Sequence, residues 1–135
     1  TERERADSLV KVDTDFRGYG SDIDPQAIKI AIKNAASTSV ADKLSFRECD
    51  IREFKRMSER GTVVCNPPYG ERLLDTESAR VLYREMGRVF EKEHGWSYYI
   101  ITPDEDFEGC FGRRADKTRN LYNGMIKCRL YMYFK

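Results

Sequence analysis

The chain has 135 residues, of which 40% are hydrophobic and 35% are charged, and its formal net charge is +1 at pH 7. This length suits one domain, and so small a net charge excludes a molecule that is basic overall and binds nucleic acid through its whole surface. No apolar run approaches the ~20 residues that a membrane-spanning helix needs, and no secretory signal opens the chain. We therefore expect no membrane partner.

Cysteine and histidine usage argues against a metal site. The four cysteines, Cys49, Cys65, Cys110 and Cys128, are widely spaced, and the single histidine, His94, has no second histidine nearby. Neither the ligand spacing of a zinc site nor a disulfide framework is present. Reduced thiols of this kind fit a cytoplasmic protein best. We expect no metal.

The first part of the chain predicts strands that alternate with helices. Residues 2–11 resemble the end of a helix that began upstream, and a short strand is expected over residues 18–24. Pro25 starts a helix for which Asp24 is the N-cap. A buried stripe is indicated by residues at i, i+3, i+4 and i+7, namely Ile28, Ala31, Ile32 and Ala35. A second strand is expected over 44–49 and a short helical turn over 50–55.

The next segment continues this alternation. Residues 62–65 form a short apolar run of the kind found in a buried parallel strand. Asp75 and Thr76 then cap a helix that reaches about Glu93 and is stopped by Gly95. Its expected buried stripe consists of Ala79, Leu82, Met86, Val89 and Phe90. Another strand is expected over 96–102.

The tail of the chain follows a different pattern. Asn123-Gly124 is a strong signal for a β-hairpin. After it, apolar residues alternate with polar residues and tyrosines over 126–135, which predicts one strand with two distinct faces. The whole order predicts an α/β fold with a doubly wound sheet and an antiparallel hairpin at the C-terminal edge.

The most informative motif is Asn66-Pro67-Pro68-Tyr69, directly after the apolar strand over residues 62–65. The prolines stop the strand and stiffen the turn, and ligands of open α/β sheets bind outside the carboxyl ends of strands. The Asn66 amide oxygen and the Pro67 carbonyl can accept the two N–H groups of an exocyclic amine and stabilise positive charge on its nitrogen. Tyr69 can stack on the base, typically worth ~1–3 kcal/mol. The alternative is a Pro-Pro turn that only ends a strand.

Three segments that follow successive strands carry a resemblance to a known family. They are Asp22-Ile23-Asp24, Glu48-Cys49-Asp50 and Asn66-Pro67-Pro68-Tyr69. The chain resembles the Rossmann-like, S-adenosylmethionine-dependent class I methyltransferases that modify exocyclic amines. It is closer to bacterial large-subunit ribosomal RNA guanine-N2 methyltransferases, which are also called N6-adenine-specific DNA methylases and usually carry an RNA-binding THUMP domain. The string from Asn66 to Leu73 and the tail over residues 115–131 resemble that subgroup.

The resemblance implies S-adenosylmethionine as the cofactor and assigns roles to four residues near the first two strands. Asp22 would accept hydrogen bonds from the ribose hydroxyls, unless it is a solvated turn acid. Asp50 would accept from the adenine amine, although a second helix cap is an equal alternative. Ile23 and Ile51 would sandwich the adenine ring, or else belong to the core. Asp24 fits a helix cap better than a ribose ligand.

One departure from the family concerns the beginning of the chain. The family's first strand and glycine-rich loop, which supports the methionine end of the cofactor, have no counterpart before Asp22, and no THUMP-like segment is present. We therefore expect residues 1–135 to be the C-terminal part of a methyltransferase domain that is inactive alone. Its expected partners are its own N-terminal part, ribosomal RNA, and a second copy through the open sheet.

The resemblance implies transfer of a methyl group to the N2-amine of a guanine in large-subunit ribosomal RNA, by direct displacement without a metal. The motif alone fits an N6-adenine DNA methyltransferase or a protein glutamine methyltransferase equally well. A non-catalytic RNA-binding fragment is the alternative from another class. A basic cluster, Arg113, Arg114, Lys117 and Arg119, either contacts RNA phosphate or is a solvated loop.

Overall fold

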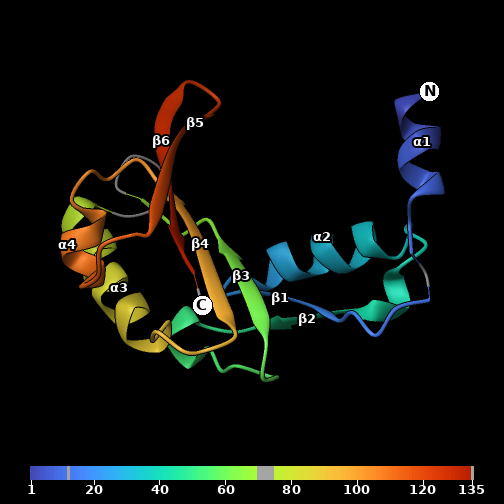
Figure 1. Ribbon diagram of the computed structural model, residues 1–135, viewed down its shortest axis with the longest axis horizontal. Helices are drawn as coiled ribbons and strands as arrows, with labels where there is room; N and C mark the ends of the chain where they lie inside the picture. The colour runs from blue at the N-terminus through green and yellow to red at the C-terminus, as the bar shows by residue number, and fades with distance from the viewer. Residues whose placement is uncertain (12, 70–74, 135) are drawn as a thin grey trace. The chain divides into compact units, whose positions relative to one another are not determined.

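The computed structural model describes residues 1–11, 13–69 and 75–134, and the chain divides into two compact units, Thr1–Ile51 and Arg52–Lys135. Figure 1 shows the helices and strands of both units. Each unit is described by itself. Among the described residues, no helix combines the length and apolar character needed to cross a membrane.

Unit 1 contains a parallel pair of strands and one long helix. Its elements are α1 (Glu2–Ser8), β1 (Gly18–Asp22), α2 (Pro25–Ala35), the 3-10 turn η1 (Ala41–Lys43) and β2 (Leu44–Glu48), and the 3-10 turn η2 (Ile51–Glu53) crosses into unit 2. Thr1 and Glu4 form a capping box at the start of α1. The Asp24 carboxylate accepts from the Gln26 backbone N–H at 2.8 Å, which confirms the predicted cap of α2.

The prediction of a buried stripe on α2 is wrong. Ile28, Ala31 and Ala35 are half-buried, Ile32 is exposed, and none of the described residues of unit 1 is buried. The spacing does place these side chains on one side of the helix, but the described sheet of this unit has only two strands. Two strands offer too little surface to cover a three-turn helix. Burial therefore contributes little to the stability of unit 1 by itself.

Unit 2 is built on a four-stranded mixed sheet in the order β3-β4-β6-β5. Its elements are β3 (Gly61–Cys65), α3 (Thr76–Val89), β4 (Trp96–Thr102), α4 (Phe107–Phe111), β5 (Lys117–Asn123) and β6 (Ile126–Tyr133). Strands β3 and β4 are parallel, and β6 runs antiparallel to both β4 and β5, as predicted. Asp75 caps α3 as predicted, but the helix ends at Val89 rather than near Glu93. Helix α4 was not predicted.

Strand β3 is parallel as predicted, but it is not buried. Val64 is 80% exposed, because alternate side chains of a strand point to opposite faces and Val64 points away from the aromatic core. The half-buried positions, Val63 and Cys65, pair with Tyr98 and Ile100 on the face that packs inward.

An aromatic core lies between the sheet and the helices α3 and α4. Tyr83, Phe107 and Tyr131 are fully buried, and the Phe107 ring centroid lies 4.7 Å from that of Tyr131. Tyr133 packs in the same way on Phe111 at 4.8 Å. The tyrosine side of β6 is therefore a core face. We expected the two faces of this strand to differ, but both contain buried residues. The last residue of the expected strand, Lys135, lies outside the described residues.

The hairpin turn differs by one residue from its prediction. Asn123 still pairs with Ile126, so the two central residues of the turn are Gly124 and Met125 rather than Asn123 and Gly124. Gly124 has φ +64°, a conformation that glycine adopts without steric cost. A glycine with positive φ at the first central position is one of the two common solutions for a tight hairpin.

Two glycines in the helices of unit 2 provide a matched test of this packing. A Cβ atom at Gly87 of α3 would collide with the backbone carbonyl of Phe111 in α4, whereas a Cβ at Gly109 of α4 meets nothing within 4 Å. We expect Gly87→Ala to destabilise unit 2 by about 1–3 kcal/mol through overpacking. Gly109→Ala should be neutral or stabilising by about 0.5–1 kcal/mol. Urea unfolding followed by fluorescence of Trp96, the single tryptophan, measures both, and equal effects would contradict the close approach of α3 and α4.

Candidate functional site

The Asn66–Tyr69 turn lies at the carboxyl end of β3, beside the carboxyl end of the parallel strand β4. Cys65, the last residue of β3, pairs with Ile100 of β4. The Asn66 side chain is exposed, whereas Pro67 is buried. Burial raises the pKa of the neighbouring Cys65 thiol to about 12, so it stays protonated at neutral pH and is not a nucleophile. Asn66 is therefore the motif's exposed polar side chain.

A buried hydroxyl fixes the middle of this turn. The Tyr83 hydroxyl of α3 donates to the Pro68 carbonyl at 3.3 Å and lies 2.9 Å from the Thr102 hydroxyl at the end of β4. Because a hydroxyl carries one proton, Thr102 then donates to Tyr83, and its oxygen accepts from the Asp104 backbone N–H at 3.2 Å. Burial raises the pKa of Tyr83, which keeps it a neutral donor. The turn is thus tied to both α3 and β4.

The end of the turn is tied to the hairpin. The Tyr69 hydroxyl accepts from the Asn123 side-chain N–H at 2.9 Å, and the Tyr69 side chain is only 4% exposed. A base can stack only on an accessible ring face, so Tyr69 is closed to stacking in this conformation. The rest of the string that resembles the family, residues 70–73, lies outside the described residues.

A polar cluster that the sequence analysis missed lies next to this turn. The Arg80 guanidinium of α3 donates to both carboxylate oxygens of Asp104, at 2.9 and 3.1 Å, and to Asp106 at 2.7 Å. These residues line a cavity of about 350 Å³, and Tyr83 also lines it. Hydrogen bonds from Arg80 hold the pKa of Asp104 below its usual value. Arg80 and Asp104 are 24 residues apart, so no local pattern could have indicated their pairing.

The predicted cofactor residues lie together in unit 1, at the carboxyl ends of its two parallel strands. Asp22 ends β1 and pairs with Glu48 of β2, and the Cys49 backbone N–H donates to the Asp22 carbonyl at 2.9 Å. The exposed Asp22 carboxylate accepts from the Asp24 backbone N–H at 2.8 Å, and Ile23 is 66% exposed.

Asp50 and Ile51, both half-buried, follow the end of β2 directly. The structure thus brings Asp22, Ile23, Asp50 and Ile51 to one edge of unit 1. The other predicted residues, Asn66, Pro67 and Tyr69, belong to unit 2.

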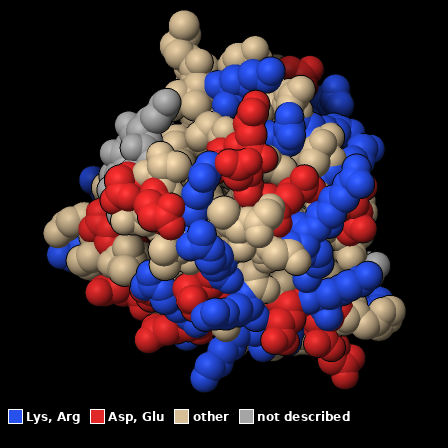
Figure 2. All heavy atoms as spheres, turned by 90° about the vertical axis from the view of Figure 1, so that its left-hand side faces the viewer, with Lys and Arg blue, Asp and Glu red and all other residues tan. Residues whose placement is uncertain are grey.

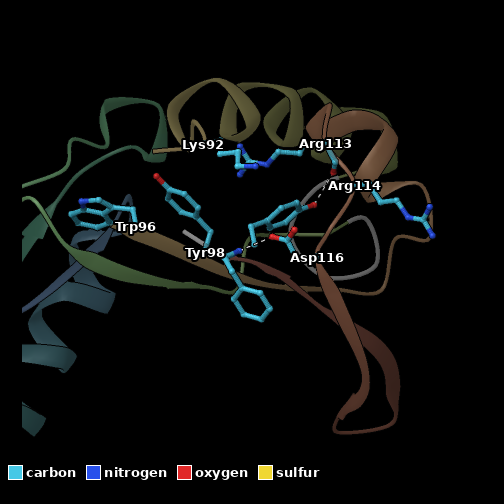
Figure 3. Close-up of a pocket in the computed structure, with 8 residues that line it drawn as sticks. Lys92, Trp96, Tyr98, Arg113, Arg114 and Asp116 are labelled. Carbon is cyan, nitrogen blue, oxygen red and sulfur yellow. Dashed lines mark hydrogen bonds between the residues drawn. The ribbon is translucent and has the colours of Figure 1, made fainter. Parts of the chain in front are cut away.

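The basic cluster of the sequence analysis contains one residue with a structural role. The Arg113 guanidinium lies over the Tyr133 and Phe111 rings, at 4.8 and 5.3 Å from their centroids, and donates to the Phe90 carbonyl at 3.1 Å. It lines a small cavity of about 80 Å³ with Trp96 and Tyr98, near the amino end of β4 (Figure 3). This cavity is at the opposite end of β4 from the Asn66–Tyr69 turn. In the described part of the chain, no group of three or more metal-ligating side chains comes together.

Comparisons with known proteins agree on one family. Residues 2–132 match the family model described as RMKL-like, methyltransferase domain. The chain is 40% identical over 116 residues to YpsC of Bacillus subtilis, a candidate RNA methyltransferase, covering 86% of this chain and 30% of that protein. It is 33% identical over 127 residues to the ribosomal RNA large subunit methyltransferase K/L of Shewanella amazonensis, covering 93% of this chain and 18% of that protein. The chain thus spans less than a third of these relatives.

Solved structures give the same fold. SMU.472, a candidate methyltransferase solved in complex with SAH, superposes with a TM-score of 0.88 at 41% identity, over 98% of this chain and 35% of that one. A predicted N6-adenine-specific DNA methylase from Listeria monocytogenes superposes with a TM-score of 0.81 at 42% identity, over 98% and 34%. TrmN from Thermus thermophilus, at 18% identity and a TM-score of 0.72, shows the fold alone. The predicted Rossmann-like methyltransferase fold is confirmed.

The Arg80–Asp104 pair predicts a specific dependence of stability on pH. Because the folded-state pKa of Asp104 is lowered, the pair contributes stability above the unfolded pKa of about 3.9 and loses it as pH falls through the folded value. We expect Arg80→Met to lower the urea midpoint of Trp96 fluorescence clearly at pH 7 and much less at pH 3.

Arg84→Met is the control, because Arg84 is on the same helix and its ion pair with Glu77 lies at the exposed surface. It should change little at either pH. An equal loss at both pH values in Arg80→Met would show that Arg80 acts through packing rather than through the ionised carboxylate.

Proposed function

Because the chain belongs to the RMKL-like methyltransferase domain family, we propose that it is part of an S-adenosylmethionine-dependent methyltransferase acting on large-subunit ribosomal RNA. The observation that carries the proposal is the exposed Asn66 amide on a turn that is anchored at the carboxyl end of β3. The names of the ribosomal RNA large subunit methyltransferase K/L relatives support the RNA substrate. The acceptor that we propose is the N2-amine of a guanine.

Unit 1 contributes the cofactor residues. When bound, S-adenosylmethionine supplies an electrophilic methyl group. The exposed Asp22 carboxylate offers two oxygens to the two vicinal ribose hydroxyls, which suits that task. Ile23 and Ile51 offer apolar surface to the two faces of the adenine ring, and Asp50 accepts from its amine. The complex of SMU.472 with SAH, a relative at 41% identity, supports this class of ligand.

Unit 2 contributes the groups that hold the target amine. The Asn66 amide oxygen and the Pro67 carbonyl each accept one N–H, which orients the nitrogen lone pair and stabilises the positive charge that develops on the nitrogen during attack. The anchoring of the turn by Tyr83 and Asn123 keeps these acceptors in place, and accurate positioning is a large part of the rate enhancement in such transfers. Tyr69 stacks on the base only once its ring is uncovered, so the proposal requires RNA entry to expose it.

An N6-adenine acceptor is the second candidate. The N6-amine presents the same two N–H groups to Asn66 and Pro67, and the Listeria monocytogenes neighbour is described as a predicted N6-adenine-specific DNA methylase. The resemblance of residues 115–131 to the guanine-N2 subgroup favours guanine. Analysis of methylated nucleosides after reaction with ribosomal RNA and with DNA distinguishes the two acceptors.

We include further parts of a longer protein among the partners. The chain spans 18–38% of the proteins named above, and apolar side chains of unit 1, such as Phe16, Tyr19 and Ile30, are exposed. An N-terminal part that completes the sheet would cover these side chains. Alternatively, a second copy of the chain that pairs with the open sheet would cover them. We propose a cytoplasmic location, where ribosomal RNA is modified.

Asn66→Ala tests the role of the motif. In the full protein, we expect methyl transfer to fall by about 10²–10³-fold, because one acceptor for the developing charge is lost. S-adenosylmethionine affinity by calorimetry should stay close to wild type. Asn34→Ala, an exposed position on α2, is the matched control and should retain full turnover. Wild-type turnover in Asn66→Ala would remove Asn66 from the site.

Asp22→Ala tests the cofactor residues. We expect weaker S-adenosylmethionine binding in the full protein, because two hydrogen bonds to a charged acceptor are lost, each worth about 1.5–3 kcal/mol. Calorimetric titration measures this loss. Asp24→Ala should instead cost about 1 kcal/mol of stability through the lost helix cap, with little change in affinity. The reverse outcome would assign the ribose contact to Asp24.

A further inference from the structure

The β5–β6 hairpin extends beyond the edge of the sheet where Asn66 lies. Strand β4 ends at Thr102, opposite Arg129 of β6. Three further β5–β6 pairs follow, from Leu121↔Cys128 to Asn123↔Ile126, and the Gly124-Met125 turn lies beyond them. At about 3.4 Å per residue, this overhang is roughly 10 Å long. Figure 1 shows the hairpin projecting past β4.

The hairpin carries positive charge only. Between Lys117 and Phe134 the sequence contains four basic residues, Lys117, Arg119, Lys127 and Arg129, and no acidic residue. The whole chain contains 24 basic and 23 acidic residues, so this segment is a clear local excess. Figure 2 shows basic and acidic side chains mixed over this face of the molecule, with both kinds near its upper rim. The hairpin as a whole therefore suits a polyanion, and Lys127 is the basic residue that lies in the overhang itself.

An exposed aromatic ring accompanies this charge. Tyr122 is 72% exposed and lies directly opposite Lys127, which is also exposed, so the two side chains share one face of the hairpin. Proteins that bind single-stranded nucleic acid combine these two elements, a ring on which a base stacks and a cation that meets the backbone phosphate.

The overhang is hydrogen-bonded to the Asn66–Tyr69 turn through the face of the hairpin that Tyr122 does not occupy. Asn123, the neighbour of Tyr122, donates to the Tyr69 hydroxyl at 2.9 Å. Because successive side chains of a strand point to opposite faces, Asn123 holds Tyr69 on one face while Tyr122 remains open on the other. This hydrogen bond places the end of β5 next to the Asn66–Tyr69 turn.

We propose that this overhang, residues 121–127, binds unpaired RNA beside the target nucleotide. Tyr122 stacks on a neighbouring base, and Lys127 contacts a phosphate. An acidic protein surface could use the same cations, but an exposed ring beside a cation at the edge of a base-modifying site favours RNA. This inference rests on the proposed function, because it assumes an RNA substrate.

The test measures RNA binding separately from methyl transfer. Anisotropy of fluorescein-labelled oligouridine reports the affinity of the full protein as salt is varied. We expect Tyr122→Ala to weaken binding by about 5- to 150-fold and Tyr122→Phe to retain it, since stacking needs the ring alone. Lys127→Gln should reduce the slope of log affinity against log salt by about 0.7, the value for one phosphate contact on a single strand.

Lys92→Gln is the matched control, because it removes one exposed positive charge just before the amino end of β4, and the slope should not change. With ribosomal RNA as substrate, Tyr122→Ala should raise KM and leave kcat close to wild type. If the wild type transfers methyl to RNA but Tyr122→Ala and Lys127→Gln bind oligouridine and RNA unchanged, the inference is wrong. If these variants lose RNA affinity while the wild type transfers no methyl, the proposed function fails and the RNA contact stands.

Discussion

The site of unit 2 depends on a short turn that is held in place at two points. The Tyr83 hydroxyl holds the Pro68 carbonyl from the core, and the Asn123 side chain holds the Tyr69 hydroxyl from the hairpin. Because Pro67 and Pro68 follow Asn66 directly, little freedom remains for the backbone that presents it. A methyl transfer of the proposed kind needs an acceptor amine in line with the methyl group, and loss of that alignment is costly. The fold of unit 2 can be understood as a support for this turn.

The two units differ in how they are stabilised. Unit 2 has an aromatic core that includes Tyr83, Phe107 and Tyr131, all fully buried. Unit 1 presents the proposed cofactor residues at the ends of β1 and β2, but none of its described residues is buried. Hydrophobic burial is the main favourable term in folding, so unit 1 needs a covering surface more than unit 2 does. This contrast agrees with a proposal in which further parts of a longer protein complete the cofactor site.

Sequence reasoning succeeded where the determinants are local. The Asp24-Pro25 start of α2, the cap of α3 at Asp75 and the strand before Asn66 each depend on a few neighbouring residues, and each is present. Burial was predicted well on α3, where Ala79, Leu82, Met86 and Phe90 of the expected stripe are buried. It was predicted poorly on α2 and β3, because burial depends on neighbours that are distant in sequence. Val64 has an apolar side chain in a strand, yet it is exposed because it points to the face of the sheet opposite the aromatic core.

The long-range contacts of the site could not be read from local patterns. Asn123 and Tyr69 are separated by 54 residues, and Arg80 and Asp104 by 24. Helix α4 has five residues and no side-chain cap, so it lacks the signals by which helices are recognised. The motif itself was prominent because its residue types have few other uses together, whereas the groups that hold it are ordinary tyrosines and asparagines.

A crystal structure of the full protein with bound S-adenosylhomocysteine would test the central claim most directly. The account predicts that the ribose hydroxyls contact Asp22, that the adenine lies between Ile23 and Ile51, and that the Asn66 amide faces the sulfur. A cofactor bound elsewhere, or an Asn66 amide turned away from the sulfur in the bound state, would contradict the assignment of these strand ends to one methyl-transfer site.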